Sequence, residues 1–230
     1  MSVVKRLTDL IRFFTSLLFK SIFIHGDIAG RHVPTALNLA LLTTQLLIAR
    51  GGVHNILVVL ASITTVYVIR DSHKVVKYAA VLALVPTVWY FLMSLPFTLS
   101  IPSSGLIALR VFTVSLSFLC FFYFLNPVEI STLMKWLGLR KASLYPVFTW
   151  RVVPHIMRDA ETALLIGEMK RVESWRSLAI SVVTTEEYVS LYEEGTYTKP
   201  CYDPYFRYDI RHSLITAVIL TTLLTFHAVA

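Results

Sequence analysis

The segment Pro154–Arg171 reads PHIMRDAETALLIGEMKR and predicts an amphipathic helix that ends on the basic pair Lys170-Arg171. A proline fits the first turn of a helix because the amide groups there have no intrahelical acceptor. We therefore expect the helix to begin at Pro154. Apolar or small residues then recur at steps of three and four, which places them on one face: Ile156, Met157, Ala160, Ala163, Leu164 and Gly167. The pattern predicts a helix that packs on one side and presents a basic tip to a partner.

The composition of the whole chain is that of an integral membrane protein. Of the 230 residues, 56% are hydrophobic and 15% are charged, and the mean hydropathy is +0.67. Soluble domains carry about 25% charged residues, so we expect the chain to be embedded in a lipid bilayer. The net charge is +7, and the charged residues cluster beside apolar segments, as they do in cytoplasmic loops. No basic face with interleaved aromatic residues predicts a nucleic-acid partner.

Five apolar segments are candidates for transmembrane helices, because a helix needs about 20 apolar residues to cross a bilayer. They are Val33–Ala49, Gly51–Ile69, Tyr78–Leu95, Leu106–Leu125 and Ser213–Ala230. The first is slightly short, and the others are adequate in length. We expect Pro96, Pro102 and Gly105 to mark a short exterior loop between the third and fourth segments.

The N-terminal residues 3–24 are also periodic, with Lys5, Arg6, Asp9 and Arg12 between the apolar positions. This pattern favours an amphipathic helix lying in the membrane interface. A short span through Phe13–Ile24 is the alternative, against which Lys20 argues.

Lysine and arginine counts predict the side of the membrane on which each connection lies. The N-terminal region holds five of them, the connection between the second and third segments three, and residues 126–210 ten. Arg50-Gly51-Gly52 holds one and residues 96–105 none. We therefore expect a multi-pass protein of the cell membrane whose N-terminus and residues 126–210 are cytoplasmic and whose C-terminus is outside.

Residues 126–210 show helical periodicity and capping residues, which a simple connector would not need. Asn126-Pro127-Val128-Glu129 has the order of a helix start, with asparagine as the cap, proline in the first turn and glutamate closing a capping box. Apolar residues then recur as far as Gly138. The helix from Pro154 comes second, and a third is predicted from Trp175 to Val189. Three amphipathic helices in succession predict a docking platform.

The sequence thus predicts an all-α integral membrane protein with about five transmembrane helices and cytoplasmic amphipathic helices. Four regions follow from it: an N-terminal amphipathic helix and loop at 1–31, a four-helix transmembrane region at 32–125, a cytoplasmic region at 126–210 and a C-terminal transmembrane helix at 211–230.

The order of motifs across about residues 106–210 resembles the transmembrane T component of energy-coupling factor (ECF) transporters, the EcfT family, whose cobalt and nickel relatives are called CbiQ. The resemblance is carried by an arginine ahead of an apolar run, an Asn-Pro turn, an Arg-x-x-Pro entry and a long helix ending on arginine. The span and coupling-helix positions are Arg110, Asn126, Pro127, Arg151, Pro154 and Gly167.

The resemblance places ATPase docking at Lys170, Arg171, Glu194 and Gly195. Lys170-Arg171-Val172 stands where the family has Ala-Arg-Gly, so the arginine is kept without its small neighbours. The second motif falls near Glu193-Glu194-Gly195, where Glu194 replaces the arginine. This second position either does not dock or meets a partner of reversed local charge.

The resemblance implies a coupling subunit without chemistry of its own. In the family, two cytoplasmic ABC ATPase subunits grip the ends of the coupling helices, and a small substrate-binding membrane subunit captures a vitamin or a cobalt or nickel ion. Closure driven by ATP moves the coupling helices. The chain itself contains no Gly-x-x-x-x-Gly-Lys-[Ser/Thr] loop, so ATP would have to bind another chain.

Two other classes of function stay open at this point. A membrane-embedded enzyme would need convergent reactive side chains within the spans, where the sequence offers Arg110, His54, His227 and Cys120 but no carboxylate. A stand-alone structural membrane protein is the other alternative. Arg110 could either extend to the membrane interface or contact a partner inside the membrane. The seven histidines show no metal-ligand spacing, so neither a metal site nor a cofactor is expected.

Overall fold

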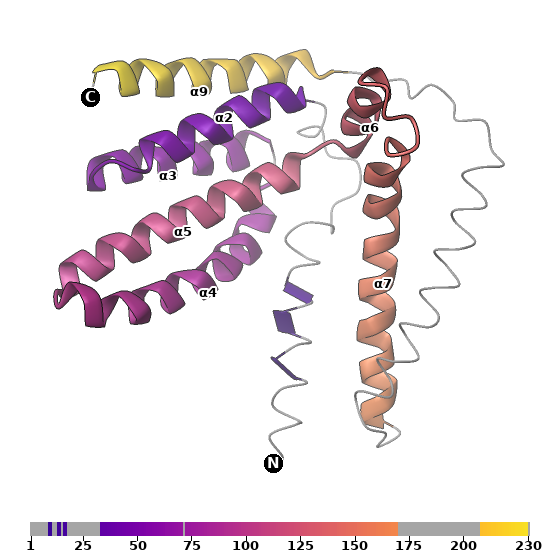
Figure 1. Ribbon diagram of the computed structural model, residues 1–230, viewed down its shortest axis with the longest axis horizontal. Coiled ribbons are helices and arrows are strands. Elements are labelled where there is room, and N and C mark those ends of the chain that lie inside the picture. Colours follow the sequence, from indigo (N-terminus) through magenta and orange to yellow (C-terminus); the bar gives the residue numbers. More distant parts are fainter. Residues whose placement is uncertain are drawn as a thin grey trace. The chain divides into compact units, whose positions relative to one another are not determined.

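A computed structural model describes residues 9–10, 13–14, 16–17, 33–70, 72–169 and 208–229, and Figure 1 shows their path. All regular structure in these ranges is α-helical, and no strand occurs among them. Three of the helices are long and apolar enough to cross a membrane. The predicted fold class, an all-α membrane protein, is confirmed. The predicted helix over Trp175–Val189 and most of the predicted N-terminal helix lie outside the described residues.

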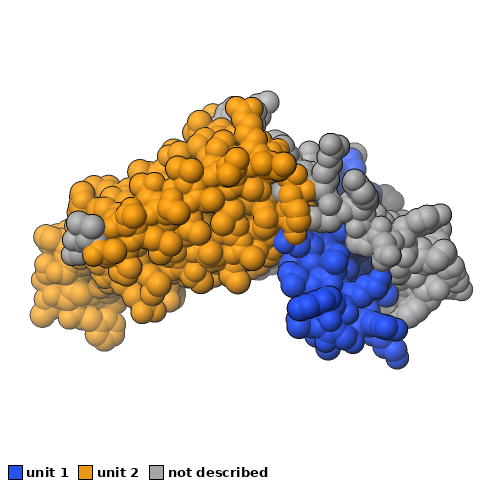
Figure 2. Space-filling model, turned by 90° about the horizontal axis from the view of Figure 1, so that it is seen from above, with its two compact units in different colours: residues 1–19, 127–206 blue, residues 20–126, 207–230 orange. Residues whose placement is uncertain are grey.

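The chain divides into two compact units, shown in Figure 2. Unit 1 comprises residues 1–19 and 127–206, and unit 2 comprises residues 20–126 and 207–230. The chain enters unit 2 at Lys20, leaves it after Asn126 and returns to it at Arg207. We refer to the last two points as the crossings.

Unit 2 is a bundle of five apolar helices that follow one another by short connections, apart from the last. They are α2 (Thr35–Ile48), α3 (Val53–Ile69), α4 (His73–Thr98), α5 (Ile101–Phe124) and α9 (Ile210–Val229). Helices α2, α4 and α9 run in one direction and α3 and α5 in the other, and α9 lies beside α2 (Figure 1). The end of the bundle that carries both crossings therefore holds the starts of α2, α4 and α9 and the ends of α3 and α5. We call this the crossing end.

The lengths of these helices differ more than the sequence suggested. The segments Val75–Thr98 and Ile101–Phe124 have 24 residues each and Ile210–Ala228 has 19, enough to span a bilayer. Helix α2 has 14 residues and α3 has 17, and 14 residues rise only about 21 Å against a hydrocarbon core of about 30 Å. The prediction of a short first segment is confirmed. The second is shorter than predicted because Gly51 and Gly52 stay outside α3, which begins at Val53.

The connection predicted around Pro96, Pro102 and Gly105 is present but shorter than predicted. Helix α4 continues through Pro96 to Thr98, and α5 starts at Ile101 with Pro102 in its first turn and Gly105 inside it. Only Leu99 and Ser100 connect the two helices, and Leu99 makes the turn with a φ of 50°. Proline is tolerated inside membrane helices because neighbouring helices and hydroxyl side chains satisfy the backbone groups that it leaves.

Unit 2 is apolar on its outside as well as in its core. Trp89, Phe97 and Ile210 are 60%, 86% and 73% exposed, whereas Asn38 and Arg70 are buried. A soluble protein would place these residue types the other way round, since exposed apolar surface is costly in water. Polar groups inside and apolar groups outside are what a lipid environment favours.

In unit 1, the first predicted helix is present. Helix α6 (Pro127–Trp136) begins at Pro127 as expected. It ends at Trp136, and Gly138 follows with a φ of 84°, which glycine adopts readily. Leu139 N–H donates to the Met134 carbonyl at 2.9 Å and Gly138 N–H to that of Lys135 at 3.1 Å, the pair of bonds that defines a Schellman ending.

The second predicted helix is present but starts earlier than expected. Helix α7 runs over Leu144–Met169, so Pro154 and Arg151 lie inside it and the prediction that Pro154 begins the helix is wrong. Pro146 occupies the first turn instead, where its missing N–H costs nothing. A proline in a helix interior removes one backbone hydrogen bond, and α7 nevertheless continues through Pro154 to Met169.

Candidate functional site

Arg70 joins four helices at the crossing end of unit 2. It is the C-terminal cap of α3 and only 3% exposed. Its Nη2 donates to Asn38 Oδ1 of α2 at 2.9 Å and to Thr216 Oγ1 of α9 at 2.6 Å. Its Cζ lies 4.4 Å from the centroid of the Phe124 ring, the last residue of α5. One side chain thus contacts α2, α5 and α9 from the end of α3.

Local backbone geometry explains why an arginine is stable at this place. A cation at the C-terminus of a helix interacts favourably with the helix dipole. The hydroxyl of Thr216 already donates to the carbonyl of His212 at 2.7 Å, so its lone pairs are left to accept from Arg70. On the other side, Ser72 Oγ donates to the Arg70 carbonyl at 3.0 Å. The ring of Phe124 supplies a cation–π contact.

Within the described part of the chain, Arg70 is held by neutral acceptors and an aromatic face, and no carboxylate pairs with it. The bond from Arg70 fixes the orientation of the Asn38 amide, because arginine is a donor only. Asn38 Nδ2 is then a buried donor without a partner. A cavity of about 10 Å³ adjoins it, lined in part by Gln45, Ser117 and Cys120. This volume suits at most one water molecule, so the cluster has no room for a substrate.

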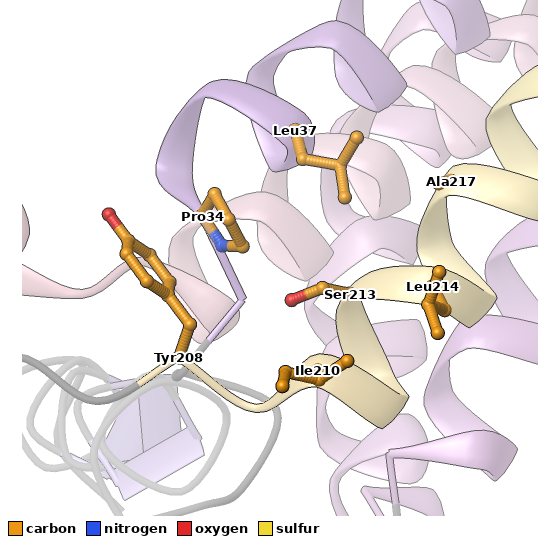
Figure 3. A pocket seen from close by; sticks show the side chains of 7 residues that line it. All are labelled: Pro34, Leu37, Tyr208, Ile210, Ser213, Leu214 and Ala217. Carbon is orange, nitrogen blue, oxygen red and sulfur yellow. The ribbon is translucent and has the colours of Figure 1, made fainter.

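A second feature of the crossing end is an open groove of about 420 Å³ between the starts of α2 and α9 (Figure 3). Its lining is almost entirely apolar and consists of Pro34, Leu37, Tyr208, Ile210, Ser213, Leu214 and Ala217. The hydroxyl of Ser213 is already used, donating to the Asp209 carbonyl at 2.7 Å. The groove therefore suits an apolar side chain or a lipid tail rather than a polar ligand.

Asp209 caps the start of α9, about two turns before Thr216. Its Oδ1 accepts from the His212 backbone N–H at 3.2 Å, and its Oδ2 lies 2.7 Å from His212 Nδ1. The first bond satisfies one of the amide groups that lack partners at a helix start. The hydrogen bond to the His212 side chain, together with that backbone bond, lowers the pKa of Asp209 below its ordinary value of 3.8.

This cap makes the stability of α9 depend on pH. Since the folded pKa of Asp209 is depressed, its contribution is fully present above the unfolded pKa and is lost as the pH falls through the folded pKa. We expect wild type to lose stability below about pH 4 relative to Asp209→Asn, because asparagine caps as well as aspartate but does not titrate. Asp209→Ala should be less stable at every pH. Thermal unfolding in detergent across this pH range measures all three, and a constant difference between wild type and Asp209→Asn would refute the assignment.

At the opposite end of unit 2, Arg110 forms hydrogen bonds with the turn between α2 and α3. Its Nη2 donates to the carbonyls of Arg50 and Gly51 at 3.0 and 2.9 Å. These carbonyls follow the end of α2, where backbone acceptors lack intrahelical donors. The sequence left open whether Arg110 extends to the interface or contacts a partner, and in this structure it ties α5 to the α2–α3 turn.

The other predicted site residues fall in different parts of the chain. Asn126 and Pro127 lie on either side of the first crossing. Arg151, Pro154 and Gly167 all lie in α7, so one helix carries them. The predicted docking residues Lys170, Arg171, Glu194 and Gly195 lie outside the described residues. Arg110, in unit 2, belongs to none of these groups.

Sequence reasoning missed the Arg70 cluster, which it counted only as loop charge. The signal that could have revealed it was an arginine placed directly after an apolar segment, together with an asparagine and a threonine inside segments otherwise free of charge. Polar groups within membrane helices tend to face one another. Which of several such residues meet depends on how helices distant in sequence pack.

Comparison of the chain with protein-family models, curated proteins and solved structures gives no match. The fold alone defines the class of the protein, which is an all-α integral membrane protein. Among the described residues, no three histidine, cysteine, aspartate or glutamate side chains are grouped to hold a metal ion.

Proposed function

We propose that the chain is the transmembrane coupling subunit of an ATP-driven importer of the energy-coupling factor type. In this role unit 2 is the membrane anchor, and unit 1 receives the motion of two cytoplasmic ABC ATPase subunits. The motion passes to a small membrane subunit that captures the substrate, a vitamin or a cobalt or nickel ion. The topology that this role requires places residues 126–210 in the cytoplasm, as the distribution of lysine and arginine predicts.

The observation that carries the proposal is the form of α7. It has 26 residues and therefore extends about 39 Å, long enough to act as a lever. Helix α7 contains the Arg151-x-x-Pro154 entry and Gly167. It ends at Met169, and Lys170 and Arg171 follow directly in the sequence. These are the positions that the resemblance to the T component requires on one coupling helix.

The exposure of α7 side chains supports a partner-facing surface. Four exposed residues recur at steps of three and four, His155, Arg158, Thr162 and Ile166, so they share one face of the helix. Their spacing continues to Lys170 in the sequence. The predicted packing residues Ile156, Met157, Ala160 and Ala163 are less exposed. A mixed basic and apolar stripe of this kind suits a groove with acidic and apolar walls.

The test is purification of the tagged full-length chain from its native membrane. We expect it to bring two chains that carry Gly-x-x-x-x-Gly-Lys-[Ser/Thr] loops, and ATP hydrolysis should occur in the complex but not in the isolated chain. Stable isolation as a homo-oligomer, with no ATP-binding chain under any mild detergent condition, would contradict the proposal. Turnover of a substrate by the chain alone would favour a membrane-embedded enzyme instead.

A further inference from the structure

The crossings at Asn126 and Arg207 lie close in sequence to residues of the Arg70 cluster. Phe124, beneath the guanidinium, is two residues before the chain leaves unit 2 after Asn126. Thr216, which accepts from the same guanidinium, lies in the second turn of α9, shortly after the chain returns at Arg207. The outgoing and returning segments are thus held by one side chain.

We infer that Arg70 is a positioning residue that fixes both crossings to each other and to the rest of unit 2, so that a load on one is transmitted to the other. This inference goes beyond the proposed function, because it needs no ATPase and holds for any partner that acts on unit 1. It rests on the three contacts of Arg70 with Asn38, Thr216 and Phe124.

The contacts of α9 explain why a single residue has this effect. Helix α9 is separated in sequence from the other four helices of unit 2, and it packs mainly along α2 and more weakly on α3. In a bilayer, apolar side chains contact lipid as favourably as they contact another helix, so apolar packing alone does not fix the register of α9. The bond from Arg70 to Thr216 is directional and charge-assisted. Because the same nitrogen also donates to Asn38, it sets the position of α9 against α2.

The consequence is that the end of α5 and the start of α9 should open together when Arg70 is replaced. Loss of a charge-assisted bond costs about 1.5–3 kcal/mol, which corresponds to an increase of about ten- to one-hundredfold in local opening. We expect this increase in Arg70→Gln at residues 122–126 and 210–217 alike. Thr216→Val, which removes one acceptor, should raise opening at 210–217 only.

Amide hydrogen exchange of the full-length chain in lipid nanodiscs measures this opening. The matched control is Arg110→Gln, which removes an arginine that also bonds to backbone acceptors in unit 2 but at the opposite end. It should leave both crossings at wild-type exchange. If Arg70→Gln does not give folded protein, Arg70→Lys keeps the charge and loses the planar contact with Phe124, and a smaller rise at both crossings is expected.

The inference is overturned if exchange rises at only one crossing in Arg70→Gln, or if Arg110→Gln changes both crossings equally. Neither result would bear on whether ATPase subunits bind unit 1. Conversely, failure to find an ATPase partner would leave the exchange result intact.

Discussion

The proposed coupling role predicts that Arg171→Glu releases the ATPase subunits while the chain itself stays folded in the membrane. Arginine is suited to such a contact because its planar fork makes paired hydrogen bonds to carboxylates and carbonyls. Reversing the charge removes those bonds and places a carboxylate against the partner's acceptors. The loss should be about 2 kcal/mol or more, so affinity should fall about thirtyfold or more.

The control for this prediction is Arg140→Glu. Arg140 is exposed between α6 and α7, and the substitution changes the net charge by the same amount. Affinity between the purified chain and the proposed ATPase subunits, measured at constant ionic strength, should be near wild type in Arg140→Glu. Equal losses in both variants would show that net charge, not a docking contact at Arg171, governs association.

Asn38→Leu is expected to destabilise unit 2 substantially. It leaves the buried guanidinium of Arg70 with one acceptor fewer, and hydrogen bonds to charged groups contribute about 1.5–3 kcal/mol each. The polar environment of Arg70 cannot be replaced by water, because the residue is 3% exposed. We expect the free energy of unfolding in mixed micelles to fall by about this amount.

Asn38→Asp is the matched control, since aspartate has nearly the same shape. It keeps an acceptor for Arg70, adds an opposite charge to a buried cation, and removes the amide nitrogen that now has no partner. Its stability should equal or exceed that of wild type. A loss in Asn38→Asp as large as that in Asn38→Leu would mean that packing, rather than the bond to Arg70, decides stability at this position.

Local sequence signals predicted the starts and stops of elements well where a single residue determines them. Pro127 begins α6 and Gly138 ends it, because each restricts the backbone by its own chemistry. The charge-free segments likewise located the five helices of unit 2, since their apolar character reflects the surrounding lipid.

The errors arose where tertiary packing outweighs a local preference. Pro96 lies inside α4, which packs closely along α5, and Pro154 lies inside α7. Proline therefore marked neither the end of α4 nor the start of α7. Arg70 was counted as a surface charge because sequence gives no sign that α9 returns to α2. The cluster with Asn38 and Thr216 exists only once helices more than one hundred residues apart in the chain are packed together.

The side of the membrane on which residues 126–210 lie decides whether unit 1 can meet a cytoplasmic motor at all. The chain has two cysteines. Cys120 is buried in unit 2 and should not react with a thiol reagent, whereas Cys201 belongs to residues 126–210. A membrane-impermeant maleimide is predicted to label Cys201 only after the cells are permeabilised. It should label Ser103→Cys, at the exposed start of α5, in intact cells, with Cys201→Ser confirming the labelled site. Labelling of Cys201 in intact cells would contradict cytoplasmic placement of unit 1 and with it the coupling role.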